Sequence, residues 1–287
     1  MQFHSPDTIK QAIELLDESQ GVNRILAGGS DILVQLRLGL TTPDLIIDIK
    51  HIDGMLDICA EGGGYRIGAG VSGAEMDEHA GLKSLWPGVV EAMALVGSTQ
   101  VQGRATMVGN LCNASPAADS VPAMVAAGAR AMIVGPKGTR TCPVQDIPSG
   151  PGKTTLQKAE IITSIYLPAR PENASDAYLR FIPRTEMDIA VSAAGVSLTL
   201  DNTGEIIEAQ VALGAVAPTV LRVDAGAEIL IGSKLDADTQ AKLQDICAAA
   251  CNPIDDRRGT VAFRRKTVGV LAKRAALIAY SRAGGLI

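Results

Sequence analysis

The chain has 287 residues, is 47% hydrophobic and 20% charged, and carries a formal net charge of −5 at pH 7. This composition predicts a folded protein of two or three subdomains, excludes a disordered chain, and argues against nucleic-acid binding. No basic segment followed by an apolar one opens the sequence, and no run approaches about eighteen apolar residues, so we expect neither a signal peptide nor a transmembrane segment.

The N-terminal part of the sequence alternates helical and strand patterns. An amphipathic helix is predicted over residues 7–18, with Asp7 as its N-cap. A short strand over 24–26 then leads through a glycine turn into a helical stretch, and a buried strand follows over 45–49. This order predicts a compact β–loop–α–β unit.

The middle of the sequence begins with two predicted strands joined by a glycine turn at 62–64. A single helical stretch is expected over 82–96, followed by a long loop rich in small residues over 105–119. Strand patterns at AMIVG, after residue 130, and at EIITSIYLP complete this part.

The polar segment 170–176 is the main linker candidate, because it contains proline and asparagine between two apolar regions. Beyond it, a hairpin with DNTG at its turn and two helices over 238–250 and 260–282 are predicted.

The stretch SGPGKTT at 149–155 looks like the phosphate loop of an ATPase. That pattern needs a glycine five positions before Gly152, and Ile147 stands there. A β-branched side chain would crowd the turn that lets backbone amides reach a phosphate. The sequence therefore argues against ATP binding here.

The stretch LAGGSDIL at 26–33 places two glycines between a predicted strand and a predicted helix. Glycine lets the backbone approach a pyrophosphate closely, and consecutive N–H groups form an anion-binding arrangement. A plain strand-to-helix turn capped by Ser30 and Asp31 explains the same residues, so both interpretations stay open.

The predicted loop 105–119 carries polar side chains without an evident turn partner: Thr106, Asn110, Asn113, Ser115 and Asp119. Polar groups separated by small apolar residues suit an amphipathic ligand such as a dinucleotide. A buried loop whose polar groups satisfy one another is the alternative.

No familiar set of catalytic side chains occurs in the sequence. Glu186 and Asp188 have the chemistry of an acid–base pair, but a solvated or salt-bridged loop accounts for them as well. The five cysteines are scattered without a CxxC pair and the three histidines are isolated, which favours reduced structural thiols over a metal or iron–sulfur site. Any redox chemistry is therefore expected to come from an organic cofactor.

Several segments together resemble the FAD-binding subunits of the molybdenum hydroxylases, the family of aerobic carbon monoxide dehydrogenase and xanthine dehydrogenase. The similar segments are AGGSDIL, LRLG, PDLIIDI and QVQGRATMVGNLCNASPAADSVPAM, and towards the C-terminus AYLRFIPRTEMDIAVSAAGVSL and FRRKTVGVLAKRAAL. The resemblance covers nearly the whole chain in order. A stand-alone flavoenzyme of the UDP-N-acetylenolpyruvoylglucosamine reductase type has a similar glycine loop and is the alternative, although the C-terminal helix matches the hydroxylase pattern.

The resemblance implies an α+β fold. Two FAD-binding subdomains of the p-cresol methylhydroxylase and vanillyl-alcohol oxidase type, over 1–55 and 56–173, would clasp FAD between them. A C-terminal α/β flavoprotein domain with an antiparallel sheet would occupy 174–287.

The resemblance also implies a set of cofactor-binding residues. Backbone amides near Gly28 and Gly29 would wrap the diphosphate, and Asp119 would accept hydrogen bonds on the ribose or adenine side. Flavin-ring neighbours would come from three separate segments of the chain. The full set is Leu26, Ala27, Gly28, Gly29, Ser30, Asp31, Ile32, Val96, Gly97, Thr106, Gly109, Asn110, Cys112, Asn113, Asp119, Ile162, Tyr178 and Arg180.

In this family a large subunit oxidises the substrate at molybdopterin, and a small subunit carries [2Fe-2S] clusters. Electrons then reach FAD on a third subunit before they leave to an external acceptor. The resemblance therefore implies FAD in this chain, with molybdopterin and [2Fe-2S] clusters only on partner subunits. It further implies a dimer of heterotrimers, in the cytoplasm or at the inner face of the membrane, with no metal ligand and no catalytic side chain in this chain.

One residue departs from the family pattern T-x-G-G-N/S, because Val108 stands where the first glycine is usual. If that position needs a positive φ, the valine would cost about 1–2 kcal/mol and weaken FAD binding.

Overall fold

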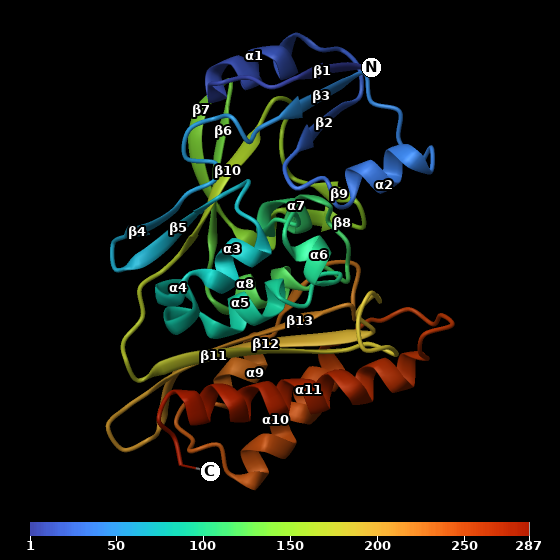
Figure 1. Cartoon of the computed structure of the whole chain (residues 1–287). Coiled ribbons are helices and arrows are strands. Elements are labelled where there is room, and N and C mark those ends of the chain that lie inside the picture. The colour runs from blue at the N-terminus through green and yellow to red at the C-terminus, as the bar shows by residue number, and fades with distance from the viewer. Residues whose placement is uncertain (287) are drawn as a thin grey trace.

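The computed structural model describes residues 1–286 as three lobes stacked along one axis, with the N-terminus in the upper lobe and the C-terminus in the lowest (Figure 1). A parallel sheet forms the upper lobe, an antiparallel sheet with short helices forms the middle lobe, and a second antiparallel sheet backed by long helices forms the third.

The upper lobe is a three-stranded parallel sheet in the order β1 (Gln2–His4), β3 (Leu45–Asp48), β2 (Asn23–Leu26). Helix α1 (Ile9–Glu18) joins β1 to β2, and α2 (Ile32–Arg37) joins β2 to β3. The predicted β–loop–α–β unit is therefore present. Every residue of the central strand is buried, as its apolar sequence predicts.

The N-cap of α1 differs from the prediction. Thr8, in extended conformation, accepts a hydrogen bond from the Gln11 N–H through its side chain. Asp7 instead lies one residue before the cap, so its prediction as N-cap is wrong.

The middle lobe contains a five-stranded antiparallel sheet in the order β4-β5-β10-β6-β7. Its strands are β4 (Ile58–Glu61), β5 (Gly64–Gly68), β6 (Arg130–Gly135), β7 (Gly138–Pro143) and β10 (Ile161–Leu167). Its helices are α3 (Gly73–Glu78), α4 (Ala80–Leu85), α5 (Pro87–Met93), α6 (Thr99–Gln102), α7 (Met107–Cys112), α8 (Ser120–Ala126) and the 3₁₀ helix η1 (Val144–Asp146).

Two predictions for the middle lobe are wrong. The helix expected over 82–96 is two helices, α4 and α5, because Pro87 cannot continue a helix but suits the first position of a new one. The stretch expected to be a loop over 105–119 contains α7, whose N-cap Thr106 accepts from the Gly109 N–H.

The SGPGKTT stretch forms a small hairpin. Strands β8 (Pro148–Gly150) and β9 (Lys153–Thr154) pair antiparallel, and Gly152 takes a φ of +69° at the turn between them. A strand–turn–strand unit lacks the helix that a phosphate loop leads into, which agrees with the exclusion of an ATPase motif.

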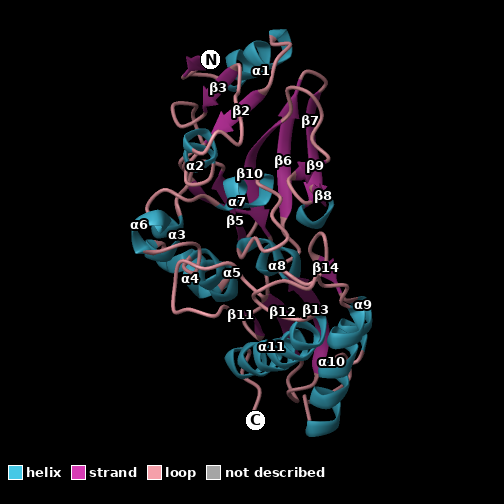
Figure 2. Ribbon diagram, turned by 90° about the vertical axis from the view of Figure 1, so that its right-hand side faces the viewer, coloured by secondary structure: helices cyan, strands magenta, loops and turns pink. Residues whose placement is uncertain are grey.

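The third lobe is an antiparallel meander of β11 (Ala174–Phe181), β12 (Ser192–Leu200), β13 (Ile206–Gly214) and β14 (Leu221–Arg222). Helices α9 (Asp224–Glu228), α10 (Ala237–Ala250) and α11 (Val261–Arg282) cover one face, while α5 and α8 of the middle lobe lie against the other (Figure 2). On β12, the side chains of Ala194, Val196 and Leu198 pack in the core that includes α11. Ala193, on the opposite face of the strand, packs in the core of the middle lobe. Burial on both faces explains why β12 carries no charged residue.

The predicted linker 170–176 is fastened to the middle lobe rather than free. Arg170 donates to Asp176 at 2.9 Å, and both side chains are buried. The Arg170 guanidinium also lies 4.4 Å from the centre of the Trp86 ring, whose Nε1–H donates to the Pro168 carbonyl.

Candidate functional site

The structure brings the two small-residue segments into contact. A Cβ on Gly28 would lie 1.6 Å from the carbonyl oxygen of Arg104 and 3.2 Å from Cα of Ala105. No side chain fits in that space, so glycine is required for the loop after β2 to approach the chain before α7. Residues 77 positions apart in the sequence (105 minus 28) thus form one surface.

The loop after β2 presents consecutive peptide N–H groups. Within the described residues, the N–H groups of Gly28, Gly29, Ser30 and Asp31 donate to no protein acceptor. Gly29 has a φ of +81°, a conformation that glycine adopts readily. These residues are half-buried to exposed, so their amides are open to water or to an anion, and consecutive free N–H groups are suited to an anion.

Side chains link this loop to the end of α7. The Asn113 side chain donates to Asp31 at 3.1 Å and accepts from Gln35 at 3.2 Å. Partial burial of the carboxyl raises the pKa of Asp31, although the residue as a whole is exposed. Asn113 therefore holds the upper lobe against the middle lobe beside the run of free amides.

Helix α7 fixes the remaining polar residues of the second segment. The Gly109 N–H donates a hydrogen bond to the Thr106 hydroxyl. The Asn110 side chain accepts from both the N–H and the hydroxyl of Ser120. Burial raises the pKa of the Cys112 thiol to about 12. Around Gly109 the chain is a helical turn and not a second glycine turn.

Val108 carries no backbone strain. It lies inside α7, it is buried, and it is absent from the residues with positive φ within the described chain. The condition for a cost, a positive φ at this position, is therefore not met, and a helical φ suits any L-residue.

Asp119 contacts the third lobe. Its two carboxylate oxygens accept from the Tyr178 hydroxyl at 2.8 Å and from the Arg180 guanidinium at 2.5 Å, both on β11. Burial raises the pKa of Asp119, while Arg180 and Tyr178 oppose that rise. Burial and the Asp119 charge hold the pKa of Tyr178 well above its usual range, so the phenol stays a donor at neutral pH.

The other predicted neighbours of the flavin ring lie on separate parts of the middle lobe. Ile162 is buried on β10 opposite Ile133, on a strand that α7 contacts. Val96 follows α5, and its N–H donates to the Met93 carbonyl. Gly97 has a φ of +65°. The sequence reasoning missed Arg104, whose carbonyl abuts Gly28, and Lys50, whose ammonium donates to the Ala27 carbonyl.

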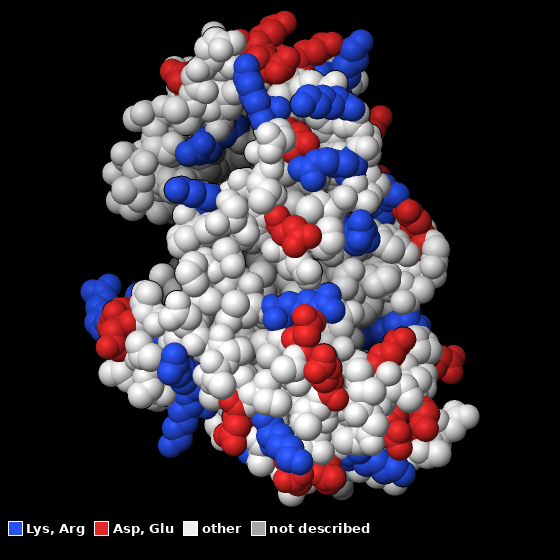
Figure 3. Space-filling model, turned by 180° about the vertical axis from the view of Figure 1, so that it is seen from behind, with Lys and Arg blue, Asp and Glu red and all other residues white. Residues whose placement is uncertain are grey.

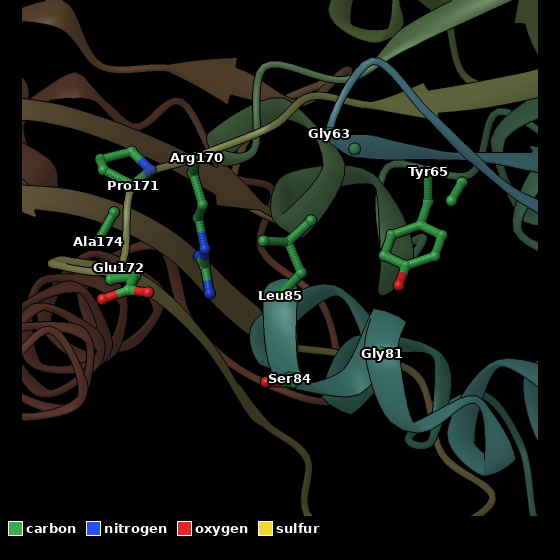
Figure 4. Close-up of a pocket in the computed structure, with 11 residues that line it drawn as sticks. Gly63, Tyr65, Gly81, Ser84, Leu85, Arg170, Pro171, Glu172 and Ala174 are labelled. Atoms are coloured by element: carbon green, nitrogen blue, oxygen red, sulfur yellow. The ribbon is translucent and has the colours of Figure 1, made fainter.

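A hollow of about 470 Å³ lies elsewhere, between β5, α4 and the segment after β10 (Figure 4). It is lined by Ala60, Gly63, Gly64, Tyr65, Gly81, Ser84, Leu85, Arg170, Pro171, Glu172 and Ala174. None of these residues belongs to the predicted cofactor site, so the hollow is a separate feature.

The surface charge is mixed. On the face opposite to Figure 1, Lys and Arg alternate with Asp and Glu without a large patch of one sign (Figure 3). Among residues 1–286, no His, Cys, Asp and Glu side chains gather into a set of three that could hold a metal ion. No helix in that described part combines the length and apolarity needed to cross a membrane.

Comparisons with known proteins match the whole length of the chain. The family described as FAD binding domain in molybdopterin dehydrogenase matches residues 1–170, and the CO dehydrogenase flavoprotein C-terminal domain matches 177–279. The carbon monoxide dehydrogenase medium chain of Afipia carboxidovorans is 30% identical, with 98% of this chain and 97% of the relative covered. A putative xanthine dehydrogenase FAD-binding subunit of Escherichia coli is 28% identical, with 99% and 97% covered. A solved structure of reconstituted CO dehydrogenase from Oligotropha carboxidovorans superposes with a TM-score of 0.93 at 29% identity, covering 98% of each chain.

Proposed function

Because the chain belongs to the family of FAD-binding subunits of molybdopterin dehydrogenases, we propose that it receives electrons from the iron–sulfur clusters of a partner subunit and delivers them to an external acceptor. FAD, when bound, supplies the redox chemistry of this transfer. The residues of this chain bind the cofactor, orient it and shield it from water.

One observation carries the proposal: the run of unpaired amides at 28–31, held against the chain before α7. A diphosphate carries two negative charges and oxygen acceptors, and four backbone donors match it without a side-chain cation. The residues present therefore fit the FAD diphosphate.

The rest of the predicted cofactor set is proposed from its position around that loop. Thr106, Asn110 and Asn113 are held by the hydrogen bonds of α7, so their backbone and side chains are rigidly placed. Tyr178 and Arg180 are directed from β11 to Asp119, which connects the third lobe with the cofactor-binding lobes.

The domain boundaries and partners are proposed as well. We place the two FAD-binding subdomains at 1–55 and 56–173 and the C-terminal domain at 174–287, which puts one of the three larger sheets in each. The relatives are named as a medium chain and as an FAD-binding subunit, which supports partner chains. We assign molybdopterin to a large partner and [2Fe-2S] clusters to a small one, in a dimer of heterotrimers in the cytoplasm or at the inner membrane face.

The stand-alone reductase is disfavoured by the third lobe. Residues 177–279 match the C-terminal domain of the CO dehydrogenase flavoproteins.

Purification from the source organism through a tag on this chain tests the proposal. We expect about one FAD per chain, together with two partners that carry the molybdenum and iron, and flavin bleaching near 450 nm when those partners are reduced. A preparation without flavin, or a chain that reduces its own substrate with NADPH without partners, would contradict it.

A further inference from the structure

Lys50 lies just beyond the end of β3 and reaches back to the amide loop. Its ammonium donates to the Ala27 carbonyl at 3.0 Å and to Asp48 Oδ1 at 2.6 Å. The Lys50 N–H also donates to Asp48 Oδ1, at 3.1 Å. The Lys50 side chain is 23% exposed, so these contacts lie in a largely enclosed place.

The position of Lys50 in the sheet favours a ligand role. Strands β2 and β3 are parallel neighbours, with Leu26 opposite Asp48, so the amide loop and Lys50 leave the same edge. Ligands of parallel α/β units bind at the carboxyl edge of the strands. The sequence IDIKHI gave no hint of this, because a lysine after a buried strand is usually only a solvated charge.

The bond to Ala27 orients the first free amide. A peptide unit is planar and trans, so its N–H points away from its C=O. When Lys50 and Asp48 fix the Ala27 carbonyl, they also fix the direction of the Gly28 N–H. The preceding peptide is held in the same way, because the Ile49 N–H donates to the Leu26 carbonyl at 3.2 Å.

The ammonium acts through its hydrogen bonds rather than through a net charge, because Asp48 pairs with it at 2.6 Å. The carboxylates near it are Asp48, which it already pairs with, and Asp31 within the loop, which accepts from Asn113. The Lys50 stem passes close to Gly70, where a Cβ would lie 3.7 Å from Lys50 Cγ. Lys50 therefore fastens the carboxyl edge of the sheet, the amide loop and the start of the middle lobe to one another.

We propose that Lys50 is a positioning residue for the cofactor diphosphate, which aims the first amide of the 28–31 loop through its hydrogen bond to the Ala27 carbonyl. This inference rests on the proposed function, since it assumes that the loop binds FAD.

The test measures FAD affinity of the full chain, with any subunits that accompany it, after the flavin has been removed and titrated back. Lys50→Met should raise the Kd for FAD about tenfold or more, since a charged hydrogen-bonding group is lost. Lys50→Arg keeps the charge and should retain most of the affinity. Lys83→Met is the matched control, because Lys83 pairs with Asp77 at 2.6 Å on the exposed surface.

Two further measurements separate positioning from folding. The double variant Asp48→Asn/Lys50→Met leaves no unpaired buried charge and should still bind FAD weakly. Riboflavin, which has no phosphate, should bind to wild type and variants alike.

The outcomes are distinguishable. A wild-type chain without FAD affinity would refute the proposed function itself. Wild-type FAD affinity in Lys50→Met and in the double variant would overturn the role of Lys50. An equal weakening of FAD and riboflavin would overturn the role at the diphosphate, because it would show only a loosened fold.

Discussion

Gly28 is the residue on which the site depends most directly. Its missing side chain lets the loop after β2 touch the Arg104 carbonyl, and the N–H groups of residues 28–31 in this loop donate to no protein acceptor within the described chain. The sequence indicated that the glycine pair suited a phosphate, but a plain turn explained it equally well. The choice between the two required the contact with residues 104–105, which no local pattern contains.

Replacement of Gly28 by alanine should therefore impair the site. The new Cβ would collide with backbone at Arg104, and we expect a loss of about 1–3 kcal/mol of stability together with at least tenfold weaker FAD binding. Gly150→Ala is the control, because no atom lies within 4 Å of a Cβ there and its φ is not in the left-handed region. Thermal melts and flavin titration check this, and equal FAD retention in both variants would show that the diphosphate lies elsewhere.

Cysteine reactivity follows the burial of each thiol. Burial raises the pKa of Cys112 and Cys247 to about 12 and that of Cys251 to about 11. Since a raised pKa favours the thiol, only about one in ten thousand Cys112 groups is a thiolate at pH 8. Iodoacetamide at pH 8 should modify exposed Cys59 first and leave these three intact in the native protein. Mass spectrometry showing Cys112 alkylated as fast as Cys59 would contradict the burial of α7.

At the scale of elements, helix α7 explains why a valine fits at position 108, where the family usually has glycine. The residue has helical backbone angles and a buried side chain, so the departure from the family's glycine is neutral for the backbone and adds packing. A loop over 105–119 would leave a positive φ open at Val108, and the sequence favours a loop there because small residues obscure helical periodicity.

Val108→Gly should lower the stability by about 2 kcal/mol and should not tighten FAD binding. The variant loses a buried side chain and adds the helix cost of glycine. The stability of Val108→Ala should lie between those of the wild type and Val108→Gly, because alanine loses the packing but adds no helix cost of glycine. A glycine variant with unchanged melting temperature and stronger FAD binding would show that the valine is strained after all.

Most elements could be predicted from the sequence because their patterns are local. The DNTG turn between two apolar runs became the β12–β13 hairpin, and α10 and α11 lie within one residue of the predicted bounds. The break between α4 and α5 was missed although Pro87 signals it, because the apolar spacing continues across the proline.

At the scale of the whole molecule, the segment between the middle and third lobes holds them together. Arg170 and Asp176 form a buried pair, and Asp176 also accepts from the Val89 N–H at 3.1 Å. The local sequence, polar and rich in turn residues, predicted a free linker. Its partners Trp86 and Val89 are more than eighty residues away, so no sequence pattern contains them.

Arg170→Ala should destabilise the chain by about 3–5 kcal/mol, since Asp176 would remain buried without its cation. Glu172→Ala, in the same segment but exposed, should change the stability by less than about 0.5 kcal/mol. Chemical denaturation compares the two, and limited proteolysis should cut the Arg170 variant faster near 168–173. Equal stability of both variants would mean that this segment does not hold the middle and third lobes together.

The arrangement of the lobes also explains why local patterns could not assemble the candidate site. Asp119 of the middle lobe meets Tyr178 and Arg180 of the third lobe, and Asn113 of the middle lobe meets Asp31 of the upper lobe. Such contacts depend on the full topology, which a family resemblance carries and hydrophobic spacing does not.

The central claim is that the amides of residues 28–31 hold the FAD diphosphate. A crystal or cryo-electron microscopy structure of the flavin-loaded protein with its partners tests this most directly. We predict phosphate oxygens within about 3.2 Å of at least two of those four nitrogens. Diphosphate density bound elsewhere, with these amides facing only water, would contradict the account.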